Sequence, residues 1–177
     1  MNSGQLCIST ERIVVDTRIA GTVEHCNALL DDALAKVAKL LCGGKADSTL
    51  MPATVLDHVT PAMPIYSEET FGPLKCIVRV GGVHAVVACA KDNEYGLSAA
   101  VFGRDSACAM NVARRIESGI CHINGPTVLD EAQMLFSGVN GGVKGSGIGR
   151  FGGQAEVAEF TELRWITVQL GPRHYPF

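Results

Sequence analysis

The chain opens with the stretch Asn2-Ser3-Gly4-Gln5-Leu6-Cys7-Ile8-Ser9, which leads into the apolar run Arg12-Ile13-Val14-Val15-Asp16. The small and polar residues before Leu6 are typical of a turn, and the apolar run predicts a buried strand. A thiol between a turn and a core strand is held in place and still reachable, as a nucleophile must be. Cys7 is therefore the candidate catalytic nucleophile, although a free cysteine is more commonly a small core residue.

Strand and helix patterns alternate downstream of this stretch. Apolar residues recur at helical spacing over residues 22–41, where Thr22 can cap the helix and Gly43-Gly44 can end it. Strands separated by helices of this length predict an α/β fold with a mainly parallel sheet and helices on both of its faces. The other expected elements are strands at 54–56, 74–80, 98–102 and 120–123, and helices at 83–91 and after a cap at Asp105 or Ser106.

The C-terminal part departs from this alternation. Residues 125–153 are rich in glycine, and residues 147–152 spell G-x-G-x-x-G. No strand pattern precedes that motif, so we expect a surface loop there and not a dinucleotide-binding loop. Residues 161–169 have the alternation of a strand but lie outside the βα rhythm, and this strand is expected to pair elsewhere. We divide the chain into an α/β region at 1–153 and a C-terminal strand and tail at 154–177.

Composition excludes several classes of function. The chain has 177 residues, of which 47% are hydrophobic, so it can bury a core. A net charge of −3 without long runs of like charge gives no basic surface for nucleic acid. No apolar run reaches the roughly 18 residues of a membrane span, and the N-terminus lacks the pattern of a signal peptide. These features predict a cytoplasmic protein that binds neither nucleic acid nor membrane.

The cysteines and histidines show no pattern of a disulfide framework or a metal site. The seven cysteines are odd in number and scattered without a CxxC pair, so reduced thiols are expected. The five histidines lack metal-ligand spacing, and no metal is expected. Apart from Cys7, the cysteines are assigned to predicted core faces: Cys26, Cys42, Cys76, Cys89, Cys108 and Cys121.

Several further motifs follow the opening stretch in a fixed order. They are Glu68-Glu69-Thr70-Phe71-Gly72-Pro73, Asn93-Glu94-Tyr95-Gly96-Leu97-Ser98-Ala99, residues 119–124, Lys144-Gly145-Ser146-Gly147 and Glu159-Phe160-Thr161-Glu162. Together with Asn2-Ser3-Gly4-Gln5-Leu6-Cys7, this series resembles the C-terminal, catalytic-cysteine part of the NAD(P)-dependent aldehyde dehydrogenase superfamily. The ending at 171–177 is similar to that of the salicylaldehyde-type bacterial branch.

The resemblance implies a role for individual residues. Cys7 matches the nucleophile, Glu69 a carboxylate that anchors a ribose, and Phe71 a ring that lies against the nicotinamide of NAD or NADP. Asn124 matches an asparagine near the active centre, although an asparagine that ends a strand is common. The implied reaction is oxidation of an aldehyde, aromatic in the salicylaldehyde-type branch, to its acid: the thiolate gives a thiohemiacetal, hydride passes to the nicotinamide, and water hydrolyses the thioester.

The sequence also departs from the family. The family's water-activating glutamate, the side-chain amide of its oxyanion hole and its nucleotide-binding βαβ region all lie upstream of the cysteine. After Ala20 the chain reaches the Thr22 helix sooner than its relatives do, and residues 135–142 replace the family's Pro-Phe-Gly-Gly. We therefore expect an incomplete cofactor site and a chain that is inactive alone, either as a homo-oligomer or beside a chain that carries the cofactor-binding half.

Two other functions compete with an enzyme fragment. The chain can be a truncated, non-enzymatic remnant or assembly module that keeps 154–177 as the oligomerisation strand of the family. A Cys–His hydrolase ranks last, because no known cysteine-protease context surrounds Cys7 and no histidine stands out as its base. Whether Met1 is a true start, which aldehyde is used and which of the two cofactors is used stay open at this point.

Overall fold

The computed structural model describes residues 20–128, 134, 144–146, 152–172 and 174. The predicted strand at 12–16, residues 135–143 and residues 147–151 lie outside the described residues. The elements in chain order are α1 (Ala20–Ala35), β1 (Lys39–Cys42), β2 (Thr54–Asp57), the 3-10 turn η3 (Pro64–Tyr66), β3 (Leu74–Cys76), α2 (Gly82–Lys91), β4 (Ser98–Val101), α3 (Ser106–Ala113), β5 (Ile120–Ile123) and α4 (Gly153–Glu159).

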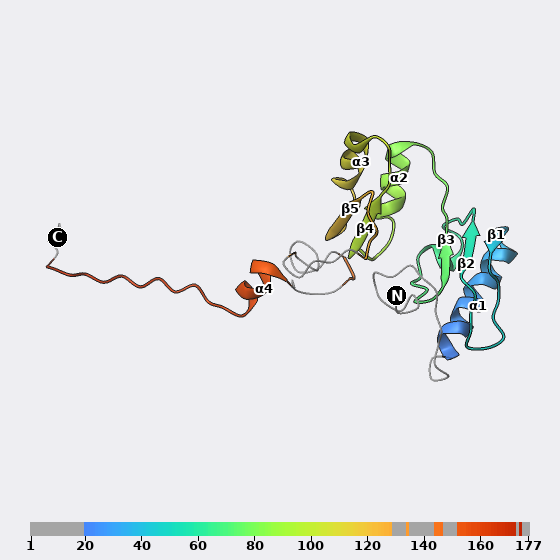
Figure 1. The fold of residues 1–177 in the computed structure, drawn as a ribbon, viewed down its shortest axis with the longest axis horizontal. Helices are drawn as coiled ribbons and strands as arrows, with labels where there is room; N and C mark the ends of the chain where they lie inside the picture. Colours follow the sequence, from blue (N-terminus) through green and yellow to red (C-terminus); the bar gives the residue numbers. More distant parts are fainter. Residues whose placement is uncertain (1–19, 129–133, 135–143, 147–151, 173, 175–177) are drawn as a thin grey trace.

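The strands of the described residues form two small sheets in two lobes. In the first lobe β1 pairs antiparallel with β2, and β2 pairs parallel with β3. In the second lobe β4 and β5 are parallel and in register from Ser98 opposite Ile120. Figure 1 shows α1 beside the first sheet and α2 and α3 beside the second. The α/β class is confirmed, whereas the single, mainly parallel sheet is not, because β1 runs antiparallel and the parallel pairs belong to separate sheets.

The first helix ends earlier than its apolar pattern predicts. It stops at Ala35, and Val37 takes a left-handed φ of 74°. Val37 N–H donates to Leu34 O at 3.1 Å and Ala38 N–H to Ala33 O at 2.9 Å. These two bonds are the Schellman motif, which closes the last turn of a helix. The prediction of a helix through residue 41 is therefore wrong, and the residues from Lys39 onward pair with β2 instead.

The core of the first lobe lies between α1 and its sheet. Leu30, Leu56 and Leu74 are each fully buried and come from α1, β2 and β3. Burying a leucine side chain contributes about 1.5–3 kcal/mol, so this cluster is the main source of stability in the lobe. Its members are Val23, Cys26, Leu29, Leu30, Ala33, Ala38, Met51, Leu56, Val59, Met63, Ile65 and Leu74.

The second lobe follows the sequence pattern closely. Asp105 caps α3, because its Oδ1 accepts from Ala107 N at 2.9 Å and from Cys108 N at 3.1 Å. Ala109 and Val112 are the buried residues of this helix, and α3 packs on both β4 and β5. The predicted cap at Asp105 and the strand at 120–123 are confirmed.

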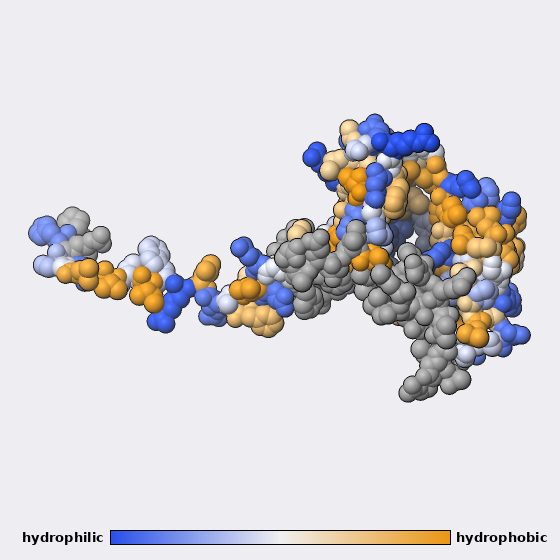
Figure 2. Space-filling view, viewed as in Figure 1, coloured by the Kyte–Doolittle hydropathy of each residue, from blue (hydrophilic) through white to orange (hydrophobic). Residues whose placement is uncertain are grey.

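The C-terminal segment projects away from both lobes (Figure 1). The short helix α4, which the sequence pattern does not predict, precedes residues 161–170, which carry no strand pairing in the structure. The predicted strand at 161–169 is therefore not confirmed, since a strand needs a partner for its backbone groups. Apolar side chains lie exposed along the segment (Figure 2), with Trp165 90% and Leu170 97% exposed. None of the described helices has the length and apolar character to cross a membrane.

A charged pair fixes the end of β2. Asp57 is 3% exposed and accepts two bonds from Arg79, from Nε at 2.8 Å and from Nη2 at 2.7 Å. The His58 N–H also donates to Asp57 Oδ1 at 2.8 Å. These bonds, with that of Arg79 foremost, lower the pKa of the Asp57 carboxyl from 3.8 to about 2.

Acid is expected to weaken the fold through Asp57. Because its pKa is lower in the folded chain than in the unfolded chain, the stability it contributes is present above about pH 4. That contribution is lost as the pH falls through about 2. We expect the Tm of the wild type to fall more steeply between about pH 5 and pH 2 than that of Asp57→Asn, whose amide does not titrate. Equal slopes for the two proteins would contradict the assignment.

Candidate functional site

Three sequence motifs meet at one pocket of about 250 Å³. The sequence analysis assigned roles to two of its residues, Glu69 and Phe71. The other residues come from the later Asn93–Ala99 and Lys144–Gly147 motifs, to which no side-chain role was assigned. The lining residues are Glu69, Phe71, Tyr95, Leu97, Gly145 and Ser146.

Helix α1 anchors the segment that carries Glu69 and Phe71. The buried Cys26 thiol donates to Thr70 O at 3.5 Å, and His25 Nε2 lies 3.4 Å from Glu69 O. A Cβ atom at Gly72 would overlap Cys26 Sγ, so only glycine allows this close approach. The backbone is thus held against the helix while Glu69 and Phe71 stay exposed.

Phe71 has a conformation that is uncommon for an aromatic residue. Its φ is +43° and its side chain is 45% exposed. A bulky residue at positive φ costs on the order of 1–3 kcal/mol and is found most often at functional sites. Phe71 and Glu69, two residues earlier, both line the pocket, and an aromatic ring beside a carboxylate is suited to a flat ring that carries a hydroxylated group.

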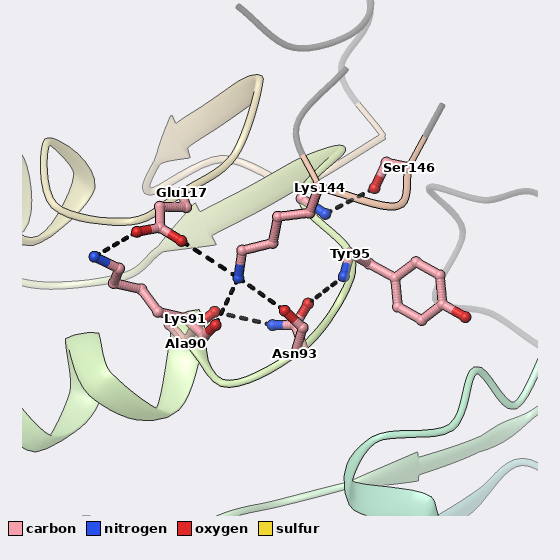
Figure 3. A network of polar contacts seen from close by, with 8 residues as sticks. Ala90, Lys91, Asn93, Tyr95, Glu117, Lys144 and Ser146 are labelled. Carbon is pink, nitrogen blue, oxygen red and sulfur yellow. Dashed lines mark hydrogen bonds and ion pairs between the residues drawn. The ribbon is translucent and has the colours of Figure 1, made fainter. Parts of the chain in front are cut away.

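The lining residues Gly145 and Ser146 are held by contacts between two segments that are distant in the sequence (Figure 3). Gly96 N–H donates to Ser146 Oγ at 2.7 Å, and Gly145 N–H donates to Glu94 O at 2.7 Å. A Cβ atom at Gly145 would lie 3.1 Å from Glu94 O, which leaves little room for a side chain. Tyr95 and Lys144 form an isolated antiparallel bridge beside these bonds.

Tyr95 is a third lining residue of the pocket whose side chain can titrate. A hydrogen bond with the Glu94 carboxylate raises the pKa of the Tyr95 phenol, and the charge of Glu69 acts in the same direction. The phenol therefore keeps its proton at neutral pH. Tyr95 is 39% exposed and lines the same pocket as Phe71.

The comparison with known families agrees with these motifs. Residues 20–166 match the sequence profile described as the aldehyde dehydrogenase family. The chain belongs to the aldehyde dehydrogenase family. The predicted resemblance is confirmed, and dehydrogenases of aromatic aldehydes are among its relatives.

One such relative is a vanillin dehydrogenase of Pseudomonas fluorescens, 45% identical over 207 residues. The match covers 99% of this chain and 42% of that aldehyde dehydrogenase, so the chain spans less than half the length of its relative. The matched stretch of 207 residues is longer than the 177 of this chain, and some residues of the relative therefore have no counterpart here.

Solved structures of aldehyde dehydrogenases share the fold. A salicylaldehyde dehydrogenase from Pseudomonas putida G7, complexed with salicylaldehyde, matches with a TM-score of 0.82 and 41% identity. That match covers 99% of this chain and 42% of the other. An NADP-dependent glyceraldehyde-3-phosphate dehydrogenase from Bacillus halodurans C-125, complexed with NADP, matches with a TM-score of 0.71 and 36% identity over 77% of this chain and 28% of the other.

The candidate nucleophile Cys7 lies outside the described residues. Burial raises the pKa of the thiols of Cys26, Cys76 and Cys121, as expected for core cysteines. Cys42 and Cys108 are exposed, so their assignment to core faces is wrong. In the part of the chain that the structure describes, no three histidine, cysteine or acidic side chains gather as metal ligands.

Asn124 takes part in local structure. Its Oδ1 accepts from Gly103 N at 2.9 Å and its Nδ2 donates to Gly103 O at 3.0 Å. Its φ is +55°, a conformation that asparagine tolerates better than most residues. The side chain thus joins the ends of β4 and β5, and it does not line the pocket of Glu69 and Phe71.

Proposed function

We propose that the chain carries the catalytic cysteine and the nicotinamide side of the cofactor site of an NAD(P)-dependent aldehyde dehydrogenase. Its proposed substrate is an aromatic aldehyde and its proposed location is the cytoplasm. The chain alone does not oxidise the aldehyde. The observation that carries the proposal is the convergence of Glu69 and Phe71 with Tyr95 and Ser146 on one pocket. The salicylaldehyde complex of its relative supports the substrate class.

The pocket fits part of a dinucleotide. Sites for whole small molecules typically measure about 300–1,000 Å³, and this pocket, at about 250 Å³, suits a nicotinamide ring with its ribose. Glu69 offers two carboxylate oxygens to the ribose hydroxyls, and Phe71 offers its face to the ring. NADP bound to the related structure supports this class of cofactor.

The residues of the chain have distinct roles in the proposed reaction. The Cys7 thiolate adds to the aldehyde carbon and forms a thiohemiacetal, because a thiolate is a strong nucleophile. When bound, NAD or NADP supplies the hydride acceptor. Glu69 and Phe71 orient that acceptor, while water activation is left to residues that the family carries upstream of the cysteine.

The C-terminal segment supports oligomerisation as an accompanying role. Phe160, Trp165 and Leu170 are each more than 80% exposed, on a segment without pairing partners in the structure. An extended chain with unpaired backbone groups and apolar side chains is suited to adding a strand to another sheet. We propose that residues 154–177 join copies of the chain to one another or to a related chain. If the chain takes no part in catalysis, this role alone would make it an assembly module.

Binding of nicotinamide mononucleotide tests the pocket. We expect the wild-type chain to bind it with a Kd of roughly 1 mM, near −4 kcal/mol, as measured by ligand-observed NMR. Glu69→Gln should weaken binding roughly fivefold or more, since it removes a charged acceptor. Glu68→Gln is the matched control, because Glu68 is also exposed and does not line the pocket. Equal losses in both variants, or equal binding of adenosine monophosphate, would count against the proposal.

Thiol labelling tests the nucleophile. Limited iodoacetamide followed by peptide mapping should label Cys7 before Cys42 and Cys108, because a catalytic thiol has raised thiolate character. The two exposed cysteines are the internal standard for accessibility. Labelling of Cys42 or Cys108 at the same rate as Cys7, or ahead of it, would remove the support for a catalytic Cys7.

A further inference from the structure

The ammonium group of Lys144 lies among acceptors at the end of α2 (Figure 3). Lys144 Nζ donates to Lys91 O at 2.5 Å and to Asn93 O at 2.8 Å, and it lies 3.5 Å from Glu117 Oε2. The Lys144 side chain is only 20% exposed, although it is charged. These acceptors match the three N–H donors of an ammonium group, so its charge is fully partnered.

The position of these acceptors explains why a lysine stands there. Lys91 is the last residue of α2, and the final carbonyl groups of a helix have no partner within it. A cation at this end also interacts favourably with the helix dipole. Glu117 connects the two lysines, because its Oε1 lies 2.5 Å from Lys91 Nζ.

The two residues after Lys144 form a wall of the pocket. Gly145 N–H bonds to Glu94 O and Ser146 Oγ accepts from Gly96 N–H, each at 2.7 Å. Asn93 holds the same turn, since its Oδ1 accepts from Tyr95 N at 2.8 Å. Lys144 itself does not line the pocket, so it can act there only through its neighbours.

We propose that Lys144 is a positioning residue, which fixes Gly145 and Ser146 against the turn of Tyr95 by binding the end of α2 and Glu117. The role in ligand binding rests on the proposed function of the pocket. Its effect is to hold this wall of the pocket in one position, so that a ring can be bound without first ordering a loop. Two of its acceptors, Lys91 O and Asn93 O, are backbone carbonyl groups. Substitutions of the side chains at these two positions would therefore leave the acceptors in place.

Amide hydrogen exchange tests the positioning directly. In Lys144→Gln we expect the Gly96 and Gly145 amides to exchange on the order of tenfold faster, as their local bonds open more often. The amide of Ile77, bonded to Leu56 O in the first lobe at 2.7 Å, should keep its rate and so exclude global unfolding. Lys144→Arg should restore most of the protection, since it keeps charge and donors. Unchanged Gly96 and Gly145 exchange in Lys144→Gln would overturn the proposal.

A second readout separates positioning from mere stability. Lys144→Gln should weaken nicotinamide mononucleotide binding about tenfold, with Lys144→Arg close to the wild type. Lys45→Gln is the matched control, because it removes the same charge and also breaks an ion pair, that of Lys45 Nζ with Asp31 Oδ2 at 2.6 Å. Lys45 does not line the pocket. Faster exchange with undiminished binding would overturn the positioning role. If the wild type binds no mononucleotide, the proposed function fails, and the exchange rates alone decide whether Lys144 fixes the wall.

Discussion

Purified alone, the 177-residue chain is expected to form no NADH from salicylaldehyde above background. In the family, the water-activating glutamate and one oxyanion donor lie upstream of the cysteine, and loss of each typically costs on the order of a hundredfold or more. Together they would lower the rate by roughly ten-thousandfold. In the proposed function, the pocket of Glu69 and Phe71 receives only the nicotinamide side, and the contacts that orient the rest of the cofactor are expected from the family's region upstream of the cysteine.

The measurement is steady-state absorbance at 340 nm with NAD or NADP, compared with Cys7→Ser. The serine variant keeps the size of the side chain and removes the thiolate, so it defines the background. A rate that depends on Cys7 in the homogeneous chain would overturn the interpretation as an incomplete enzyme. Activity that appears only after mixing with a chain that carries the cofactor-binding half would support it.

Local patterns predicted the elements whose ends are marked by side chains. Asp105 caps α3 because its carboxylate reaches two free amides one turn ahead, a feature written in adjacent residues. The stretch Ile120–Ile123 forms β5 as expected, whereas α3 ends at Ala113 and not at the predicted Gly119. At such positions the local sequence alone determines the conformation, and contacts with distant residues do not alter it.

The end of α1 shows why other boundaries could not be predicted. Val37 takes the left-handed position of the Schellman motif, which normally belongs to glycine. Its β-branched side chain is 85% exposed, so nothing in the apolar pattern marks it as a turn. The pairing of Lys39–Cys42 with β2 supplies the competing backbone bonds, and these depend on residues Thr54–Asp57, well beyond any local window.

The candidate site was predicted only in part for the same reason. Motif resemblance identified Glu69 and Phe71, which the structure places on the pocket. It gave no signal that Ser146 would bond to Gly96, because those residues lie 50 positions apart. The exposed Cys108 was wrongly assigned to a core face, since a helix of eight residues leaves the phase of its buried stripe poorly defined.

Leu56→Ala is expected to destabilise the first lobe by about 2–5 kcal/mol. Leu56 is fully buried on the central strand of its sheet, so truncation leaves a cavity between β2 and α1. That cost is a large fraction of the roughly 5–15 kcal/mol that holds a typical domain folded. The effect should reach the pocket, because Thr54 N–H on the same strand bonds to Pro73 O at 2.7 Å, two residues after Phe71.

Leu40→Ala is the matched control, since Leu40 lies directly opposite Leu56 in the ladder and is 37% exposed. The same truncation there removes less buried surface, and we expect a loss well below that of Leu56→Ala. Urea unfolding should be followed by far-UV circular dichroism, because the single tryptophan, Trp165, lies 90% exposed on the C-terminal segment and reports poorly on the core. Equal losses in the free energy of unfolding for Leu40→Ala and Leu56→Ala would show that the cluster around α1 is not the stabilising core. That result would also contradict the anchoring of Glu69 and Phe71 on the first lobe.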